Sequence, residues 1–121
     1  MTTAWSALRL RELTIPNRVW LSPMCQYSAD DGTPTDWHLA HYGSRAAGGV
    51  GMVVVECTGV APDMRTTARD LGLYTGDQVA GHHRLAAAIR SIGSIPAVQL
   101  GVAGRKSSHG APWDNARPRT P

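Results

Sequence analysis

Short apolar runs alternate with longer segments of helical periodicity along this chain. Residues Leu13–Ile15 and 18–21 have the composition of two short strands, and Pro23 ends the second of them. The pair Pro16-Asn17 between the two runs is typical of a turn. The pattern therefore predicts an N-terminal hairpin built from these two strands.

The first helix is predicted over residues 36–47. Thr35 or Asp36 supplies the side-chain oxygen that helix N-caps favour, and the pair Gly48-Gly49 is a stop signal after the last helical position. The β-branched run 50–55 comes next. A continuous apolar run of this kind indicates a strand that is buried on both faces, as in parallel sheets.

The second helix is predicted after a long loop over residues 58–74. Thr75 and Gln78 have the spacing of a capping box, and Gly93 ends the helix. The apolar run 95–100 that follows predicts another buried strand.

This alternation of strands and helices predicts an α/β fold with a parallel sheet and right-handed crossovers. Two architectures fit the order, namely an open doubly wound sheet and the N-terminal part of a (β/α)8 TIM barrel. No G-x-G-x-x-G fingerprint follows the first strand, which argues against a dinucleotide-binding unit of the doubly wound kind. A complete barrel needs about 250 residues. A barrel formed by this chain of 121 residues would therefore be incomplete.

The composition limits the function classes. With 42% hydrophobic and 17% charged residues, the chain is expected to be an ordinary soluble globular domain. It has no apolar run of about eighteen residues and no secretory signal, so we expect a cytoplasmic protein without a membrane partner. Its two cysteines match neither a zinc spacing nor a disulfide framework, and no metal site is expected.

The charge is modestly basic. Twelve basic and nine acidic side chains give a net charge of +3, and Arg105-Lys106, Arg117 and Arg119 make the end of the chain locally basic. A basic segment of this kind is consistent with an alternative function, that of an interaction module that binds nucleic acid or protein. No basic block occurs elsewhere, however, and a nucleic-acid partner is not expected.

The carboxyl ends of the predicted strands carry the candidate chemistry, because ligands bind there in parallel α/β proteins. Residues 22–25 follow the first strand, residues 56–58 the second and residues 99–101 the third. These positions hold small groups, one amide side chain and two thiols, but no pair of carboxylates and no Ser/His/Asp order. Such a set suits a large, planar, neutral ligand better than a hydrolytic reaction.

Six groups of short motifs are spread along the chain between residues 13 and 106. They are Asn17-Arg18; Ser22-Pro23-Met24-Cys25-Gln26-Tyr27-Ser28; Trp37-His38-Leu39-Ala40-His41-Tyr42 with Ser44-Arg45-Ala46; Val55-Glu56; Asp70-Leu71-Gly72-Leu73; and Gln99-Leu100 with Ala103-Gly104-Arg105-Lys106. In order and spacing they resemble the opening of the Old Yellow Enzyme family of FMN-dependent ene-reductases. The similarity is to its thermophilic-like or xenobiotic-reductase branch, in which a cysteine occupies the position of Cys25.

This resemblance implies a TIM barrel with FMN across its carboxyl-terminal mouth, so that residues 1–121 form the N-terminal portion of one FMN-binding domain. It implies that NADPH or NADH reduces the flavin. The flavin N5 then passes hydride to the β-carbon of an α,β-unsaturated carbonyl compound, a small-molecule enone or related electrophile. The parent enzyme is expected to be a homo-oligomer.

The resemblance also assigns site residues by position. Ser22, Pro23, Met24 and Cys25 would line the flavin, and Cys25 would lie near its reactive edge. A thiol there tunes the flavin through weak hydrogen bonding and polarisability.

Three further positions complete the assignment. Cys57 would contact the flavin where the family usually has alanine or threonine, and Gln99 would present its amide to the flavin pyrimidine. Tyr27 would hydrogen-bond the carbonyl group of the substrate. Val102 stands where the family usually shows a histidine, which is a departure in the loop after the third strand.

No catalytic residue is assigned within the chain. The resemblance places the proton-donating tyrosine, the histidine or asparagine pair that holds the substrate and the phosphate-binding arginine in later strands. His38 and His41 are expected to pack on the first helix rather than to bind metal, and His82-His83 are expected at the surface of the second.

Other classes remain open beside this assignment. A different barrel enzyme, such as an aldolase or isomerase, would need a lysine or carboxylate at a strand end, and Lys106, the only lysine, lies beyond its strand. A non-catalytic barrel remnant or basic interaction module is the second alternative. The isolated fragment is expected to have no ene-reductase activity of its own.

Overall fold

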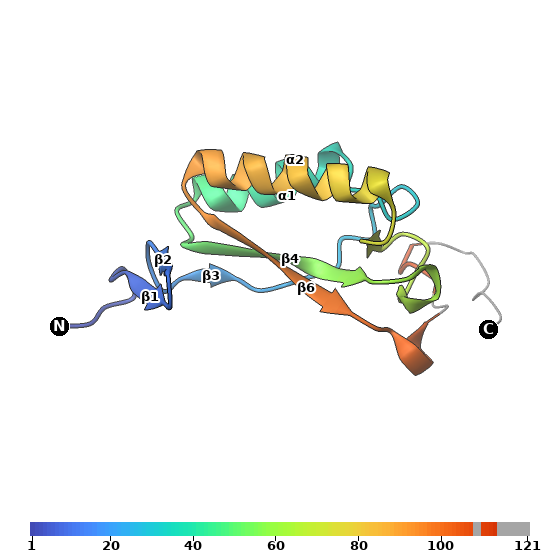
Figure 1. The fold of residues 1–121 in the computed structure, drawn as a ribbon, viewed down its shortest axis with the longest axis horizontal. Coiled ribbons are helices and arrows are strands. Elements are labelled where there is room, and N and C mark those ends of the chain that lie inside the picture. Colours follow the sequence, from blue (N-terminus) through green and yellow to red (C-terminus); the bar gives the residue numbers. More distant parts are fainter. Residues whose placement is uncertain (108–109, 114–121) are drawn as a thin grey trace.

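The fold has two layers, with two helices lying side by side on one face of a small sheet (Figure 1). This arrangement is that of a computed structural model, which describes residues 1–107 and 110–113. The helices are α1 (Asp36–Ala47) and α2 (Gly76–Ile92), and neither is long and apolar enough to cross a membrane. Arg105 is exposed in the short helix η2 (Gly104–Lys106), whereas Arg117 and Arg119 lie outside the described residues.

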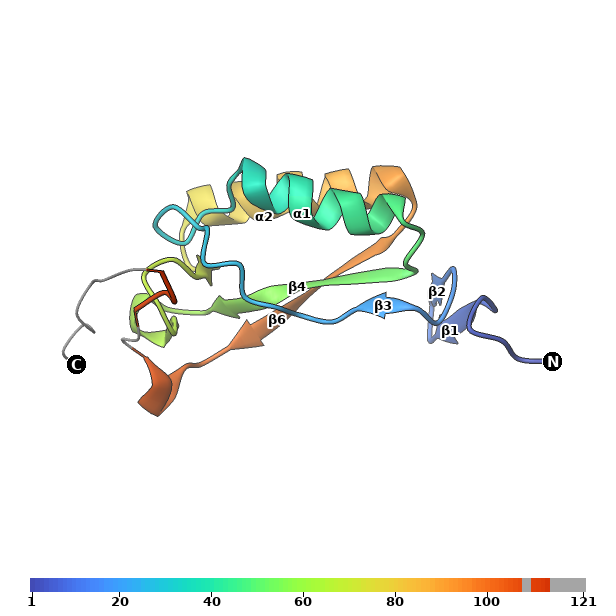
Figure 2. The ribbon, with the colours of Figure 1, turned by 180° about the vertical axis from the view of Figure 1, so that it is seen from behind.

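The sheet is parallel. Its main strands are β3 (Trp20–Leu21), β4 (Met52–Gly59) and β6 (Ile95–Gly101), with β4 in the middle. The short strand β5 (Leu71–Gly72) pairs with the last two residues of β4. Seen from behind, both helices again lie on the same side of the strands (Figure 2). The predicted order of parallel strands and helices is confirmed.

The N-terminal hairpin differs from the prediction. Strand β1 (Leu8–Leu10) pairs antiparallel with β2 (Leu13–Ile15) through the turn Arg11-Glu12, so the predicted pairing of β2 with residues 18–21 is wrong. Arg11 has a φ of 54°, and the favoured two-residue hairpin turns need a positive φ at this position. The turn contains no glycine, asparagine or aspartate, so the sequence carries little signal for it.

The helix ends follow the sequence signals. Thr75 Oγ1 accepts a hydrogen bond from the Gln78 backbone N–H, and Gln78 Oε1 accepts one from the Thr75 N–H, which is the predicted capping box. Gly93 ends α2 with a φ of 107°, a left-handed conformation that favours glycine. Thr35 is the N-cap of α1.

The core lies between the helices and β4. Its buried members are Ala29, Tyr42, Ala46, Val53, Val55, Leu71, Leu85 and Ile89. Strand β4 runs to Gly59, beyond the predicted end at residue 55, and the predicted loop contains the short helix η1 (Pro62–Met64) and β5.

Strand β6 is less buried than predicted. Among the described strands it pairs with β4 alone, so one of its edges is open. Val98 and Leu100 are exposed, the second by 58%, although the apolar run predicted a strand covered on both faces. The apolar sequence of β6 suits a strand with packing partners on both faces, and the described residues supply only some of these partners.

Asn17 fixes the start of β3 against β4. Its Oδ1 accepts hydrogen bonds from the backbone N–H groups of Val19 (3.0 Å) and Gly51 (2.8 Å). Its Nδ2 donates to the Gly49 carbonyl oxygen (2.8 Å), and the residue is only 8% exposed. The Asn17 side chain thus links the start of β3 to the turn before β4 through hydrogen bonds.

Asn17→Ala is expected to lower the free energy of unfolding by about 3 kcal/mol, because three hydrogen bonds of about 1 kcal/mol each are lost. Urea denaturation followed by circular dichroism measures the loss. Ser91→Ala is the control, since it removes one exposed side-chain hydrogen bond and is expected to change stability by less than about 0.5 kcal/mol. Equal stability of the two variants would contradict the role of Asn17.

Candidate functional site

A β-bulge near the carboxyl end of β4 shapes the site. The register between β4 and β6 shifts after Val55, so that Glu56 and Cys57 lie opposite Gln99 alone. Successive side chains of a regular strand point to opposite faces, and a bulge breaks this alternation. Val55 belongs to the core under the helices, and the Glu56 carboxyl group accepts a hydrogen bond from the Tyr42 hydroxyl of α1. Two consecutive side chains therefore face the helical layer.

Side chains form hydrogen bonds with the backbone groups around this bulge. The Glu56 N–H donates to Tyr42 Oη (2.9 Å), and Thr58 Oγ1 donates to the Glu56 carbonyl oxygen (2.9 Å). The irregular backbone is thus stabilised by one side chain from α1 and one from β4 itself.

The carboxyl group of Glu56 is fully buried and hydrogen-bonded on both oxygens. Its Oε2 accepts from the Tyr42 hydroxyl (2.7 Å) and its Oε1 accepts from the Gln26 backbone N–H (3.2 Å). Burial, with electrostatic repulsion from Glu56 as a further cause, raises the pKa of Tyr42 well above its usual range. The phenol therefore keeps its proton and acts as the donor in this pair.

His38 completes the surroundings of Glu56. The His38 ring is fully buried, and its Nε2 lies 3.7 Å from Glu56 Oε2. Its Nδ1 accepts a hydrogen bond from the Thr35 backbone N–H (3.0 Å). Because Nδ1 is an acceptor, the proton of the neutral ring is on Nε2 and faces the carboxyl group. Within the described ranges, no three His, Cys, Asp or Glu side chains gather in a metal-binding arrangement.

The structure brings Cys25, Cys57 and Tyr27 together at the carboxyl end of the sheet. Both thiols and the Tyr27 side chain are half-buried. Burial, followed by repulsion from Asp70 and Glu56, raises the pKa of Cys25 to about 11, and the same causes raise the pKa of Cys57. Both thiols are therefore protonated at neutral pH, so they are weak hydrogen-bond donors rather than nucleophiles.

Four other predicted site residues lie at the same end of the sheet. Ser22 and Met24 are exposed and Pro23 is half-buried on the segment that leaves β3. Gln99 is exposed on β6, and the register places it beside the bulge. These side chains remain accessible around the thiol cluster.

Tyr27 is held in an unusual conformation. Its φ of 52° lies in the left-handed region, which a residue with a side chain seldom adopts. Its ring packs edge-on against Trp113, with the ring centroids 5.4 Å apart and an interplanar angle of 86°. Sequence reasoning missed Trp113, because a single tryptophan in a glycine- and proline-rich segment gives no indication of its contact.

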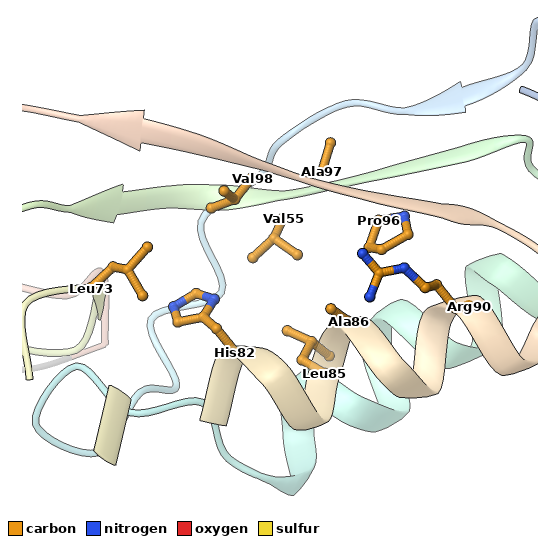
Figure 3. A pocket seen from close by; sticks show the side chains of 9 residues that line it. All are labelled: Val55, Leu73, His82, Leu85, Ala86, Arg90, Pro96, Ala97 and Val98. Atoms are coloured by element: carbon orange, nitrogen blue, oxygen red, sulfur yellow. The ribbon is translucent and has the colours of Figure 1, made fainter. Parts of the chain in front are cut away.

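A separate apolar groove of about 150 Å³ lies between α2 and β6 (Figure 3). Leu85 and Val98 are among its apolar lining residues, and His82 and Arg90 are its polar ones. His82 also lies against the backbone, with Nε2 3.2 Å from the Gly72 carbonyl oxygen. His82 is therefore half-buried, since its side chain lies against Gly72 and lines the groove, whereas His83 is exposed as predicted.

Comparison with known proteins identifies the family. The family model of the NADH:flavin oxidoreductase / NADH oxidase family matches residues 5–117, and the chain belongs to this family. The chain is 44% identical over 108 residues to NADPH dehydrogenases of Geobacillus thermodenitrificans (strain NG80-2) and Geobacillus sp. (strain WCH70). The aligned region covers 88% of this chain and 32% of each relative. The chain thus spans about a third of the length of these relatives.

Solved structures agree on the fold. Morphinone reductase matches with a TM-score of 0.81 and 30% identity, over 88% of this chain and 28% of that protein. The old yellow enzyme from Trypanosoma cruzi matches with a TM-score of 0.79 and 26% identity, over 86% and 28% respectively. These proteins are (β/α)8 barrels, and the described residues form an open part of such a barrel.

The comparisons confirm the resemblance seen in the sequence and the fold class predicted from it. The barrel architecture replaces the doubly wound alternative. The family is one of oxidoreductases, which excludes the aldolase and isomerase alternatives. FMN is the cofactor that the family implies, and the names of the relatives agree with a nicotinamide reductant. Morphinone reductase, for example, has been solved in complex with tetrahydroNAD.

Cys57 and Gly101 are packed against each other at the end of the sheet. A Cβ placed on Gly101 would overlap the Cys57 sulfur. Gly101→Ala is therefore expected to lower the free energy of unfolding by about 1–3 kcal/mol, the usual cost of overpacking. Adding Cys57→Ala is expected to restore most of the loss, with a coupling of at least about 1 kcal/mol.

A double-mutant cycle in urea measures this coupling. Gly76→Ala is the matched control, because a Cβ there meets nothing within 4 Å. Additive effects of the substitutions at positions 57 and 101 would show that the two residues are not in steric contact.

Proposed function

We propose that this chain supplies the first part of the FMN site of an NAD(P)H-dependent reductase. The reaction proposed for the whole enzyme is reduction of the C=C bond of α,β-unsaturated carbonyl compounds. When bound, FMN supplies the hydride chemistry, accepting hydride from NADPH or NADH and delivering it from N5 to the β-carbon of the substrate. This chain contributes the surface on which the flavin and the substrate are held.

The observation that carries the proposal is the chemistry of the cluster around the β4 bulge. Its accessible groups are two protonated thiols, the Gln99 amide and the Tyr27 phenol, all of which are uncharged at neutral pH. The carboxyl groups that act on them, those of Asp70 and Glu56, are both buried and hydrogen-bonded. An uncharged, polarisable surface with one amide fits the ring system of FMN, which is planar and carries both donors and acceptors.

Within this proposal each predicted residue has a role. Ser22, Pro23, Met24 and Cys25 line the flavin, and the Cys25 thiol donates a weak hydrogen bond near its reactive edge. This role agrees with the protonated state that burial imposes on the thiol.

The remaining assignments concern the neighbouring strands and the substrate. Gln99 presents its amide to the flavin pyrimidine, and Cys57 contacts the ring from β4. Tyr27 orients the substrate by donating a hydrogen bond to its carbonyl oxygen. Val102, which is 63% exposed, supplies no hydrogen bond where the family usually shows a histidine. The loop after β6 therefore contributes less to this site than it does in the family pattern.

The proposal extends to the rest of the enzyme. Residues 1–121 would be the N-terminal portion of one barrel domain, and further βα units, as in the longer relatives, would cover the open edge of β6 and the groove beside α2. Those units would also supply the phosphate-binding groups and the proton donor. We further propose a cytoplasmic homo-oligomer that acts on small molecules rather than on nucleic acid or membranes.

Residues 1–121 alone are expected to be inactive, because the proposal assigns the phosphate-binding groups of the site to further βα units. With added FMN, NADPH and 2-cyclohexenone, the purified chain is expected to show no enone-dependent NADPH oxidation above the rate without enone. The Geobacillus thermodenitrificans NADPH dehydrogenase serves as the parallel reference preparation. Enone-dependent oxidation by the chain alone would refute this expectation.

A chimera tests the proposed function directly. The corresponding segment of the Geobacillus thermodenitrificans enzyme is replaced by residues 5–117, the range that the family match covers. We expect a yellow protein that retains FMN through gel filtration and oxidises NADPH with the enone. A chimera that folds, as judged by circular dichroism, but retains no flavin would refute the proposal. Val102→His in the same chimera shows whether that departure limits activity.

A further inference from the structure

Glu56 lies behind the thiol cluster rather than in it, since its carboxyl group is fully buried. We propose that Glu56 is a positioning residue, which fixes the segment from Cys25 to Tyr27 at the mouth of the barrel by holding the backbone N–H of Gln26. The inference rests on the proposed function in one respect, namely that this segment faces a flavin. The positioning itself follows from contacts within the chain.

The bond between Glu56 and Gln26 is the more buried of the anchors that hold this segment to the rest of the fold. The Gln26 side chain accepts from Trp37 Nε1 (3.1 Å), and the Tyr27 carbonyl oxygen accepts from Arg69 Nε (3.4 Å), but both bonds are exposed to solvent. Water competes with exposed hydrogen bonds, and a bond to a buried carboxyl group is stronger than a bond between neutral groups. Of these three anchors, Glu56 therefore supplies the strongest restraint on the Gln26 backbone.

Glu56 is itself restrained from two sides. The bulge in β4 turns its side chain toward α1, and the Tyr42 hydroxyl both donates to its Oε2 and accepts from its backbone N–H. His38 packs against the same oxygen at 3.7 Å. Because α1, β4 and the segment after β3 meet at one carboxyl group, a change at Glu56 is transmitted to Cys25 without direct contact with a ligand.

A glutamine cannot replace Glu56 in this arrangement. The amide has one acceptor oxygen, so either the Gln26 N–H or the Tyr42 O–H loses its acceptor. If the amide oxygen faces Gln26, the amide N–H₂ faces the Tyr42 hydroxyl. That hydroxyl already accepts a hydrogen bond from the Glu56 backbone N–H, and it would have to accept a second one from the amide. Glu56→Gln therefore preserves the volume of the side chain but breaks one of the two hydrogen bonds that hold the carboxyl group between Gln26 and Tyr42, which weakens the restraint.

Amide hydrogen exchange is the direct test, carried out on the chain itself. In Glu56→Gln, the exchange of the Gln26 amide is expected to increase at least tenfold relative to that of core amides such as Val53. Ser94→Ala is the matched control, because it removes a buried hydrogen bond (2.6 Å, to the Val50 carbonyl oxygen) at the other end of the sheet. The control is expected to leave the ratio of Gln26 to Val53 exchange unchanged.

Tyr42→Phe is the second variant, for the case in which Glu56→Gln does not fold. It keeps the carboxyl group and removes one of its donors, so the Gln26 amide is again expected to exchange faster relative to the core. An unchanged ratio in the folded variants would overturn the inference. So would an increase that is shared equally by Gln26 and Val53, since this would mean that Glu56 only stabilises the fold.

A second readout follows the Cys25 thiol. The groups facing Cys25 are Asp70, Glu56 and Cys57, with Tyr27 beside it on the same segment. Removing the negative charge of Glu56 removes one of the causes that raise the pKa of Cys25, so iodoacetamide is expected to alkylate this thiol faster at pH 9. Tryptic peptides 19–45 and 46–65 separate Cys25 from Cys57. An unchanged rate with faster Gln26 exchange would overturn the electrostatic part.

The chimera separates this inference from the proposed function. If the chimera binds FMN, Glu56→Gln is expected to shift the flavin reduction potential and absorption spectrum, and Ser94→Ala is not. A chimera that folds without binding FMN refutes the proposed function, while the exchange result still decides the positioning role. Bound flavin with an unshifted potential would overturn the extension of that role to the cofactor.

Discussion

A single buried carboxyl group organises this end of the sheet. A carboxylate removed from water without partners costs several kcal/mol, so a fold that buries one must also bring donors to it. Glu56 obtains them from the Tyr42 hydroxyl and the Gln26 backbone N–H. These donors come from α1 and from the segment after β3, so the position of each depends on Glu56. The bulge in β4 allows the arrangement, because a regular strand would direct this side chain to the other face.

Sequence patterns predicted the parts of this fold that depend on local chemistry. The capping box of α2, its final glycine and the parallel order of the strands follow from residue type and spacing. The hairpin was assigned to the wrong partners, because the turn Arg11-Glu12 lacks the residues that usually mark tight turns, while Pro16-Asn17 has them. The bulge was not predicted either, since it shows only in the pairing of β4 with β6. Register is a property of two strands together, and neither sequence alone contains it.

The sequence indicated where the candidate residues lie in the fold, but not their chemical state. The resemblance placed Cys25, Cys57 and Tyr27 at strand ends, and the structure brings these three together. It did not indicate that both thiols stay protonated, because that depends on burial and on the nearby carboxyl groups of Asp70 and Glu56. An ionisable residue directly after a run of valines was the one available sign that Glu56 has buried partners, since such a residue is seldom fully buried unless it is paired.

The contact between Cys57 and Gly101 couples the choice of residue at two positions of the sheet. A sulfur at position 57 fills the space that a Cβ at position 101 would need, so the two positions share one volume. A side chain at position 101 therefore fits only beside a smaller residue at position 57. Libraries intended to reshape this end of the sheet accordingly vary both positions together, because a scan of position 101 that keeps Cys57 samples only overpacked pairs.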